Sequence, residues 1–411
     1  MKKLTQNFIW MGSANAISGV INVLLYVYLA RLLGAERFGR FSFVQVIVLY
    51  MFSFIDLGLS TFGIREIAKH KSAVSDYVSN IVSLRFFIAA ALYSLLAIFA
   101  VFSKQLWEVK IIMIIMPLWF FTFAFATEWA FQGLEKMYMV FISLVTTSAL
   151  QFFFIWLLVK GPHYFFSVPS ILFVATLPII IIYLWLLKFR FKIKTLDLEI
   201  LKVYFSSALI IWAISLFAQI YNGFDVIMMG WMRPASEVGY FTVARRFIGG
   251  ITFFSIFLAN AALPRYAATL RDGLDKFKVN TRQFLGVVGL IGAILLILVL
   301  FSKKLIVFAV GSEYLAASMS FNILMLGAVF VLLNLPFSTA LIAAGLEKDV
   351  LWQVIASAVL NVGLNFYLIP KWGMEGASLS FVYAEALAVT WVVWLYRNKI
   401  ELGIKSVTGP P

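Results

Sequence analysis

Long apolar runs separated by short polar segments make up almost the whole chain. A helix needs about 20 apolar residues to cross the ~30 Å hydrocarbon core of a bilayer. Measured against that length, the pattern predicts twelve membrane-spanning helices. Nearly every face of each run is apolar, so run length and polar interruptions, rather than periodicity, set the boundaries. The predicted spans lie near 8–30, 41–62, 84–103, 111–132, 138–159, 166–187, 204–231, 239–263, 284–301, 317–344, 350–369 and 376–396.

Composition supports the same interpretation. The 411 residues are 63% hydrophobic and only 13% charged, whereas a soluble domain carries about 25% charged residues. Such a chain cannot enclose its apolar surface in water, which predicts an all-α polytopic membrane protein. The first apolar run is too long for a signal peptide and is interpreted as the first span. The longest segments predicted outside the membrane are 63–83 and 265–283.

Several kinds of chemistry are excluded by residues the chain lacks. It has no cysteine and two histidines, His70 and His163, which excludes disulfide scaffolds, thiol catalysis and Cys/His zinc sites. No G-x-x-x-x-G-K-[ST] loop occurs, so ATP is not bound in the P-loop manner. We therefore expect no metal and no cofactor. The net charge of +14 is interpreted through membrane topology, and no nucleic-acid partner is expected.

The distribution of basic residues predicts the orientation. With the N-terminus in the cytoplasm, 20 of the 33 Lys and Arg residues fall on the cytoplasmic side, ten on the other side and three within spans. Cytoplasmic loops of membrane proteins carry the excess of Lys and Arg. The two-to-one bias predicts that both termini are cytoplasmic.

A repeated segment suggests an internal duplication. FATEWAFQGLEK at 125–136 and FSTALIAAGLEK at 337–348 share six of twelve residues at an offset of 212, and Gly161 and Gly373 continue the match. Each GLEK is predicted to end a helix at its glycine and to form a cytoplasmic turn, although a generic helix-turn signal would look the same. Because each half holds six spans, the halves would be parallel repeats, a common transporter plan.

The domain boundaries follow from this repeat. Residues 1–187 form a predicted N-terminal lobe and residues 203–411 a predicted C-terminal lobe. Between them, the linker 188–202 alternates bases with apolar residues. Such a segment favours the anionic surface of the inner leaflet. A basic patch that recruits substrate is the alternative.

Four stretches resemble the polysaccharide-biosynthesis flippases of the multidrug/oligosaccharidyl-lipid/polysaccharide exporter superfamily: ARLLGAERFGRFSF (30–43), DLGLSTFGIREIA (56–68), WAFQGLEKM (129–137) and SEVGYFTVARRFI (236–248). The resemblance covers nearly the whole chain and depends on the order and spacing of the motifs. It implies two helical lobes around a polar, often cationic cavity in the inner (cytoplasmic) membrane. The implied substrate is an oligosaccharide on undecaprenyl pyrophosphate, moved from the inner to the outer leaflet.

Ionisable groups inside spans are the first candidates for a site, because their burial is costly. Arg245 and Arg246 lie early in the eighth span, and helix rise puts Arg245 about 9 Å below its outer end. Asp225 in the seventh span reaches the same depth. This predicts either a pyrophosphate-binding arginine held by Asp225 or a neutralised structural pair. The resemblance favours Arg245, because related flippases carry an arginine in a similar YxxAxR stretch (here Tyr240 and Ala244).

Three further charged groups are candidates with alternative interpretations. Glu385 lies near the middle of the twelfth span, where it either couples transport to protons or stays protonated and hydrogen-bonded. Asp56, next to glycines near the inner end of the second span, is either an ion-coupling group or a cap or hinge. Arg85 opens the third span, where it either binds substrate or anchors the helix at the interface.

Polar residues elsewhere complete the candidate set. Arg31, in the first outer loop, could meet phosphate in an outward-open state, although solvated loop charge is the commoner explanation. Asn22, Asn222 and Gln45 lie in spans. Their amides suit sugar hydroxyls and equally suit hydrogen bonds between helices.

Two other functions compete with flipping. A multidrug exporter of the same superfamily would favour an acidic cavity, whereas the spans hold Arg85, Arg245 and Arg246 against three acids. A polysaccharide polymerase or glycosyltransferase would carry a large catalytic outer loop, and here the outer loops are short. We therefore expect a non-enzymatic flippase whose partners are the lipid-linked oligosaccharide, membrane lipids, H⁺ or Na⁺ as a coupling ion, and a polymerase with other assembly proteins.

Overall fold

The computed structural model describes residues 2–189, 212, 216, 219–220 and 223–401. Helices connected by short turns make up these residues, and the described part of the chain contains no β-strand. The chain divides into two compact units, Met1–Gln219 and Ile220–Pro411. Apart from Lys188 and Phe189, the linker predicted at 188–202 lies outside the described residues.

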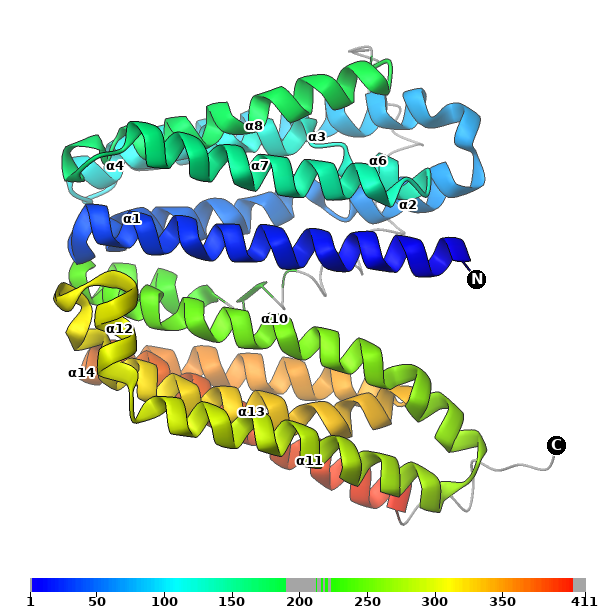
Figure 1. Ribbon diagram of the computed structural model, residues 1–411. Helices are drawn as coiled ribbons and strands as arrows, with labels where there is room; N and C mark the ends of the chain where they lie inside the picture. Colours follow the sequence, from blue (N-terminus) through cyan, green and yellow to red (C-terminus); the bar gives the residue numbers. More distant parts are fainter. Residues whose placement is uncertain (1, 190–211, 213–215, 217–218, 221–222, 402–411) are drawn as a thin grey trace. The chain divides into compact units, whose positions relative to one another are not determined.

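The first unit is a bundle in which α1 packs on α7 and α7 packs on α8 (Figure 1). Its longest helix, α1, bends at Gly34, which has a φ of 72°, and so contains the first two predicted spans. The fourth span is broken into short helices around Pro117 and Ala126. The elements are α1 (Lys2–Asp56), α2 (Leu59–Lys69), η1 (Lys71–Ala73), α3 (Val74–Phe102), α4 (Trp107–Ile115), η2 (Met116–Leu118), α5 (Trp119–Phe125), α6 (Glu128–Gly133), α7 (Met137–Leu158), η3 (Pro162–Tyr164) and α8 (Ser167–Leu186).

The second unit is built around α13, which packs on α10, α11 and α14. The bent helix here is α14, with a non-helical φ of 55° at Gly373, so it contains the last two predicted spans. Pro336 lies within α13 without ending it. The elements are a helix at Gly223–Met232, α10 (Ala235–Arg271), α11 (Leu274–Val299), α12 (Ser302–Val310), η4 (Ser312–Ala316), α13 (Ala317–Ala343), α14 (Glu347–Leu395) and η5 (Tyr396–Glu401).

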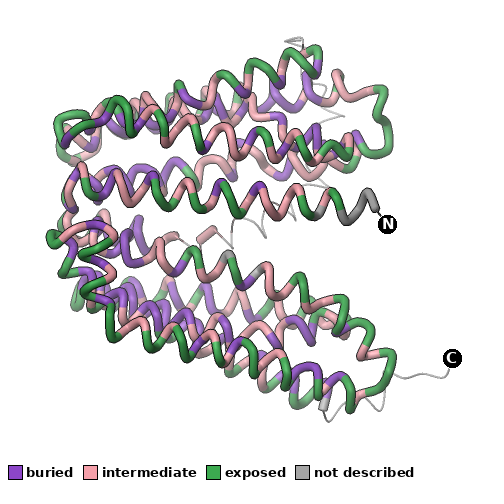
Figure 2. Tube along the Cα trace, in the orientation of Figure 1, coloured by how far each residue is buried: buried purple, intermediate pink, exposed green. Residues whose placement is uncertain are grey.

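The exposed surface of these helices confirms a membrane-spanning protein. Nine helices in the described residues are long and apolar enough to cross a bilayer, and two of them, α1 and α14, are each bent into two spans. On α11, Val287, Leu290, Ile294 and Ile297 are all exposed at helical spacing, which forms an apolar stripe suited to lipid. Figure 2 shows such exposed positions along the length of the helices, and not only at their ends.

Helices extend further than the apolar runs predict. Much of the predicted loop 63–83 is helical, since α2 continues to Lys69 and α3 begins at Val74. The predicted loop 265–283 is also mostly helix, because α10 ends at Arg271 and α11 begins at Leu274. A helix outside the bilayer can carry polar side chains. The end of an apolar run therefore marks where a helix leaves the lipid and not where the helix stops.

Relative to the GLEK motif, the helix before the second copy ends two residues earlier than the helix before the first copy. In the second copy, α13 ends before Gly345, which has a φ of 78°, and α14 begins at Glu347. In the first copy, α6 runs through Gly133 and the left-handed residue is Glu135, with a φ of 59°. The prediction that the helix ends at the glycine thus agrees with both copies, since α6 ends at Gly133 and α13 ends two residues before Gly345, but only Gly345 has the left-handed conformation.

Packing explains why the first copy still has a glycine. A Cβ on Gly133 would lie 2.9 Å from Cβ of Ile67 and 3.0 Å from the backbone oxygen of Ile64. Gly133 therefore lets α6 approach α2 closely. One amino acid type serves as a backbone turn in one copy and as a helix contact in the other.

Candidate functional site

A buried ion pair lies inside the second unit. Arg245 on α10 places Nε 3.3 Å from Oδ2 of Asp225, on the helix Gly223–Met232. The two side chains are 13% and 2% exposed. Oδ1 of Asp225 accepts a hydrogen bond of 2.8 Å from the backbone N–H of Val226. The carboxylate is thus held from two sides, and it fixes the position of the arginine.

An aromatic ring packs against the same arginine. The guanidinium carbon of Arg245 lies 4.3 Å from the centroid of the Phe381 ring on α14, a distance at which a cation is attracted to an aromatic face. The same ring abuts Gly327 of α13, where a Cβ would lie 2.6 Å from ring atoms. Residues from three helices therefore meet at this ion pair, and α13 packs against the Phe381 ring. Phe381 and Gly327 are contacts that the sequence analysis missed, and no local sequence signal points to them.

Arg246 and Glu385 lie near this cluster in sequence or on its helices. Arg246 follows Arg245 and is half-buried, and Glu385 is buried on α14 four residues after Phe381. Both side chains are engaged in further interactions. Their predicted roles, substrate binding for Arg246 and ion coupling for Glu385, stay predictions.

A second buried arginine organises the first unit. Arg85 on α3 is 1% exposed and forms an ion pair with Asp56. It also donates to Oγ of Ser60 and, at 3.3 Å, to the backbone oxygen of Ala126. The rings of Phe123 and Trp129 each lie with their centroids 5.6 Å from its guanidinium carbon. Arg85 is therefore a buried hub, not the interfacial anchor that the sequence also allowed.

The groups that bind Arg85 lie at two helix breaks. Asp56 ends α1, and Leu57 and Gly58 follow with φ values of 45° and 78° before α2 begins. Across that break, Asp56 accepts hydrogen bonds from the backbone N–H and the hydroxyl of Ser60, at 3.1 and 2.8 Å. Ala126 follows α5 in an extended conformation before α6 begins. Arg85 thus pairs with the carboxylate at the break between α1 and α2 and donates to the free carbonyl at the break between α5 and α6.

The remaining candidates form hydrogen bonds within the first unit or lie outside the described part. Asn22 donates to Oγ of Ser148 on α7 at 3.2 Å, and the Gln45 amide donates to the hydroxyl of Tyr26. These are the interhelical bonds that the sequence offered as an alternative to sugar binding. Arg31 is exposed and has a bonding partner. Asn222 lies outside the described residues.

A buried polar stripe on α14 was missed by the sequence analysis. Gln353, Ser357, Asn361 and Asn365 are spaced four residues apart and are all buried. Gln353 donates to Ser357 at 3.1 Å, and Asn365 donates to Asn361 at 3.1 Å. The four-residue spacing of polar residues within an apolar run was the available signal.

Among the described residues, no group of His, Cys, Asp and Glu could hold a metal ion.

This fold resembles solved transporters. The lipid II flippase MurJ, in an inward closed conformation, matches with a TM-score of 0.70 over 96% of this chain and 87% of that chain, at 15% identity. An inward-facing multidrug resistance MATE family transporter of the MOP superfamily matches with a TM-score of 0.69 over 95% and 96%, at 16% identity. The chain thus has the same helical fold as these two solved transporters.

Sequence comparison defines the family. The model described as "Polysaccharide biosynthesis protein" matches residues 4–270, more than half of the chain, so the chain belongs to that family. The MatE model matches residues 211–367. The chain is 24% identical over 409 residues to the "Putative O-antigen transporter" of Escherichia coli (strain K12), covering 96% of this chain and 97% of the relative. It is 23% identical over 416 residues to the capsular polysaccharide biosynthesis protein CapF of Staphylococcus aureus, covering 96% and 100%.

Proposed function

We propose that this transporter flips an oligosaccharide linked to undecaprenyl pyrophosphate from the cytoplasmic to the outer leaflet by alternating access. The observation that supports it most directly is Arg245, a cation kept among apolar helices by Asp225 and Phe381. A guanidinium binds phosphate oxygens through paired, charge-assisted hydrogen bonds. Arg245 would therefore receive the pyrophosphate, with Arg246 and Arg85 as further cationic positions.

Physical chemistry explains why such a substrate needs a protein. Sugar hydroxyls carried through hydrocarbon would lose their hydrogen-bond partners, at several kcal/mol each. A polar path lowers that barrier while the polyprenyl chain stays in lipid. Amides such as those of Asn22, Gln45 and Asn222 suit the hydroxyls. The relatives named for O-antigen transport and capsular polysaccharide biosynthesis support this substrate class.

The proposal includes an orientation and a set of partners. The excess of Lys and Arg on one side favours cytoplasmic termini in the inner membrane. The lobes 1–187 and 203–411, joined by the basic segment 188–202, would move against each other during transport. Glu385, Asp225 and Asp56 are the candidates for coupling to H⁺ or Na⁺. A polymerase and other assembly proteins would use the flipped product.

Gene deletion tests the proposal. Cells without the chain should accumulate lipid-linked repeat units in the inner leaflet and lose the surface polysaccharide. Expression of the intact chain should remove the accumulated precursor and restore the surface polysaccharide. Normal surface polysaccharide in the deletion strain, with no stranded precursor, would refute the proposed substrate class.

Drug export by the same fold is the second candidate. The match of the MatE model to residues 211–367 favours it, and the buried acids Asp225 and Glu385 could bind cationic compounds. In the same deletion strain, increased sensitivity to cationic drugs with unchanged polysaccharide would favour this candidate over flipping.

A further inference from the structure

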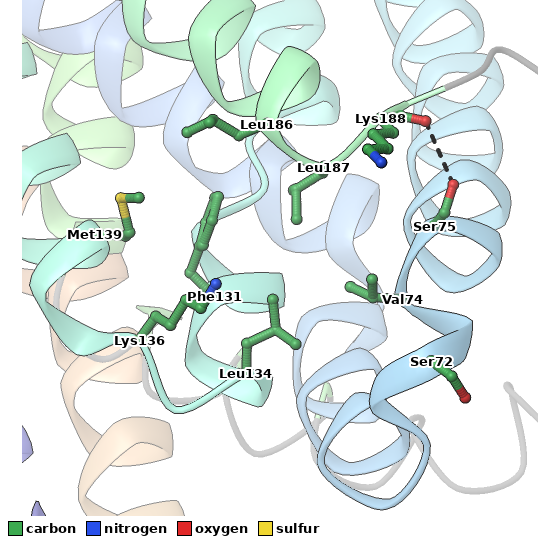
Figure 3. A pocket seen from close by; sticks show the side chains of 10 residues that line it. All are labelled: Ser72, Val74, Ser75, Phe131, Leu134, Lys136, Met139, Leu186, Leu187 and Lys188. Atoms are coloured by element: carbon green, nitrogen blue, oxygen red, sulfur yellow. Dashed lines mark hydrogen bonds between the residues drawn. The ribbon is translucent and has the colours of Figure 1, made fainter.

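A cavity of about 610 Å³ opens at one end of the first unit (Figure 3). Its walls come from the beginning of α3, the end of α6, the beginning of α7 and the end of α8. These are the helix ends that we propose to face the cytoplasm. Neither Asp56 nor Arg85 lines the cavity, and Asp225 and Arg245 belong to the other unit.

The lining of this cavity combines basic, hydroxyl and apolar groups. Lys136 and Lys188 supply two ammonium groups. The hydroxyl of Ser75 donates a hydrogen bond of 3.4 Å to the backbone oxygen of Lys188 and so connects the end of α8 to the beginning of α3 (Figure 3). Phe131 and Leu187 belong to an apolar wall, as Figure 3 shows. The cavity thus has the two kinds of surface that an amphiphile with an anionic head requires.

The charge balance around the cavity is positive. Among the described residues, neither Lys136 nor Lys188 has a carboxylate partner. The nearby Glu135 pairs with Lys71, at 3.7 Å, and Asp76, in the first turn of α3, has an interaction of its own. Both α3 and α7 begin at the cavity, and helix N-termini carry a partial positive charge. An anion would complete this arrangement.

Exposed aromatic residues next to the cavity favour a position near the lipid headgroups. Trp185 on α8 is 77% exposed and Tyr138 on α7 is 41% exposed, and both lie next in sequence to cavity-lining residues. Exposed Trp and Tyr on membrane helices concentrate at the membrane–water interface. A phospholipid of the leaflet could place its phosphate at this depth while its acyl chains lie along the exposed apolar surface of α8.

We propose that this cavity is a binding site for an anionic phospholipid of the adjacent leaflet, such as phosphatidylglycerol. Lys136 and Lys188 bind the headgroup phosphate, and the wall containing Phe131 and Leu187 contacts the glycerol and the upper acyl chain. The site accounts for the presence of two lysines without carboxylate partners at the end of an apolar bundle.

A binding experiment on the full-length protein tests this site. The purified chain in a neutral detergent is titrated with short-chain phosphatidylglycerol, short-chain phosphatidylcholine or inorganic phosphate, and the bound molecules are counted by native mass spectrometry. We expect phosphatidylglycerol to bind preferentially. Each of K136Q and K188Q should weaken this binding roughly fivefold, since a basic residue near an anionic lipid surface contributes about that factor.

The internal repeat supplies the matched control. Lys348 is the exposed lysine of the second GLEK segment, so K348Q removes the same charge from the same motif and should leave lipid binding unchanged. Equal loss in K348Q, or unchanged binding in the double variant K136Q/K188Q, would overturn the site. Inorganic phosphate that binds as tightly as the lipid and displaces it would overturn the lipid as occupant. The assay has no polysaccharide readout, so its outcome is independent of the proposed transport function.

Discussion

Arg85 and Asp56 form an ion pair that connects the unbroken helix α3 to the break between α1 and α2. The two partners differ in exposure, at 1% for the Arg85 side chain and 22% for the Asp56 side chain. The carboxylate is therefore partly accessible at the surface of the unit, whereas the guanidinium is enclosed. This difference in exposure predicts that substitutions of the two residues lower the stability of the protein by different amounts.

Removing the carboxylate should be the more damaging change. Asp56→Asn leaves a buried cation without its counter-charge, a defect of about 3–5 kcal/mol in comparable pairs. Arg85→Met leaves a carboxylate that is partly exposed and still accepts hydrogen bonds from Ser60, so it should lower the melting temperature of the detergent-purified chain by less. The double variant should recover most of the loss caused by Asp56→Asn. Strictly additive losses would show that the two groups do not interact.

The two GLEK glycines should respond differently to the same substitutions. Gly345→Ala meets open space but requires a left-handed alanine, at about 1 kcal/mol. Gly133→Ala keeps a helical backbone but pushes against Ile67 and Ile64, at about 1–3 kcal/mol. Thermal unfolding of each variant measures both effects.

Asparagine distinguishes the two causes, because it adopts the left-handed conformation more readily than alanine does. Gly345→Asn should be milder than Gly345→Ala, whereas Gly133→Asn should be worse than Gly133→Ala because its side chain is larger. The same ranking at both positions would contradict the separate roles assigned to the two glycines.

Within the described residues, the predicted spans correspond to helices in the same order, because bilayer thickness sets a length that apolar runs must match. Most of the predicted seventh span lies outside the described residues. The sequence also placed Asp225 level with Arg245, since both depths were counted along helices from the same turn, and the two side chains are in contact. It did not pair Asp56 with Arg85. That contact depends on the helix break at Leu57 and Gly58, which apolar composition does not mark.

Contacts made across the bundle were equally invisible. Phe381 reaches Arg245 only because Gly327 leaves room for its ring on α13, and neither residue stands out among the apolar residues of its span. The ends of α2 and α3 were also missed, because hydropathy reports on lipid contact while backbone hydrogen bonding decides helix length. The contact between Asp225 and Arg245 was therefore predictable because charged residues are rare in the spans, whereas contacts that depend on packing were not.

Arg245 should be essential for transport if it receives pyrophosphate. Arg245→Ala is expected to abolish surface polysaccharide while the protein remains inserted at normal abundance. Arg245→Lys keeps the charge but loses the planar fork that matches phosphate oxygens, so export should fall by about tenfold rather than vanish. Measurement of surface polysaccharide, normalised to membrane-inserted protein, distinguishes these outcomes. Normal polysaccharide in Arg245→Ala would remove the pyrophosphate assignment.

Glu385 provides a test of ion coupling. A carboxyl buried in the middle of a span can carry a proton between the two sides only if it ionises, and glutamine cannot. If Glu385 couples transport to protons, the residual export in Glu385→Gln should no longer respond to collapse of the proton gradient, whereas export by the unaltered chain should fall. Glu347→Gln, an exposed substitution at the start of the same helix, is the matched control and should keep the full response. Unchanged sensitivity in Glu385→Gln would assign the residue to hydrogen bonding between helices instead.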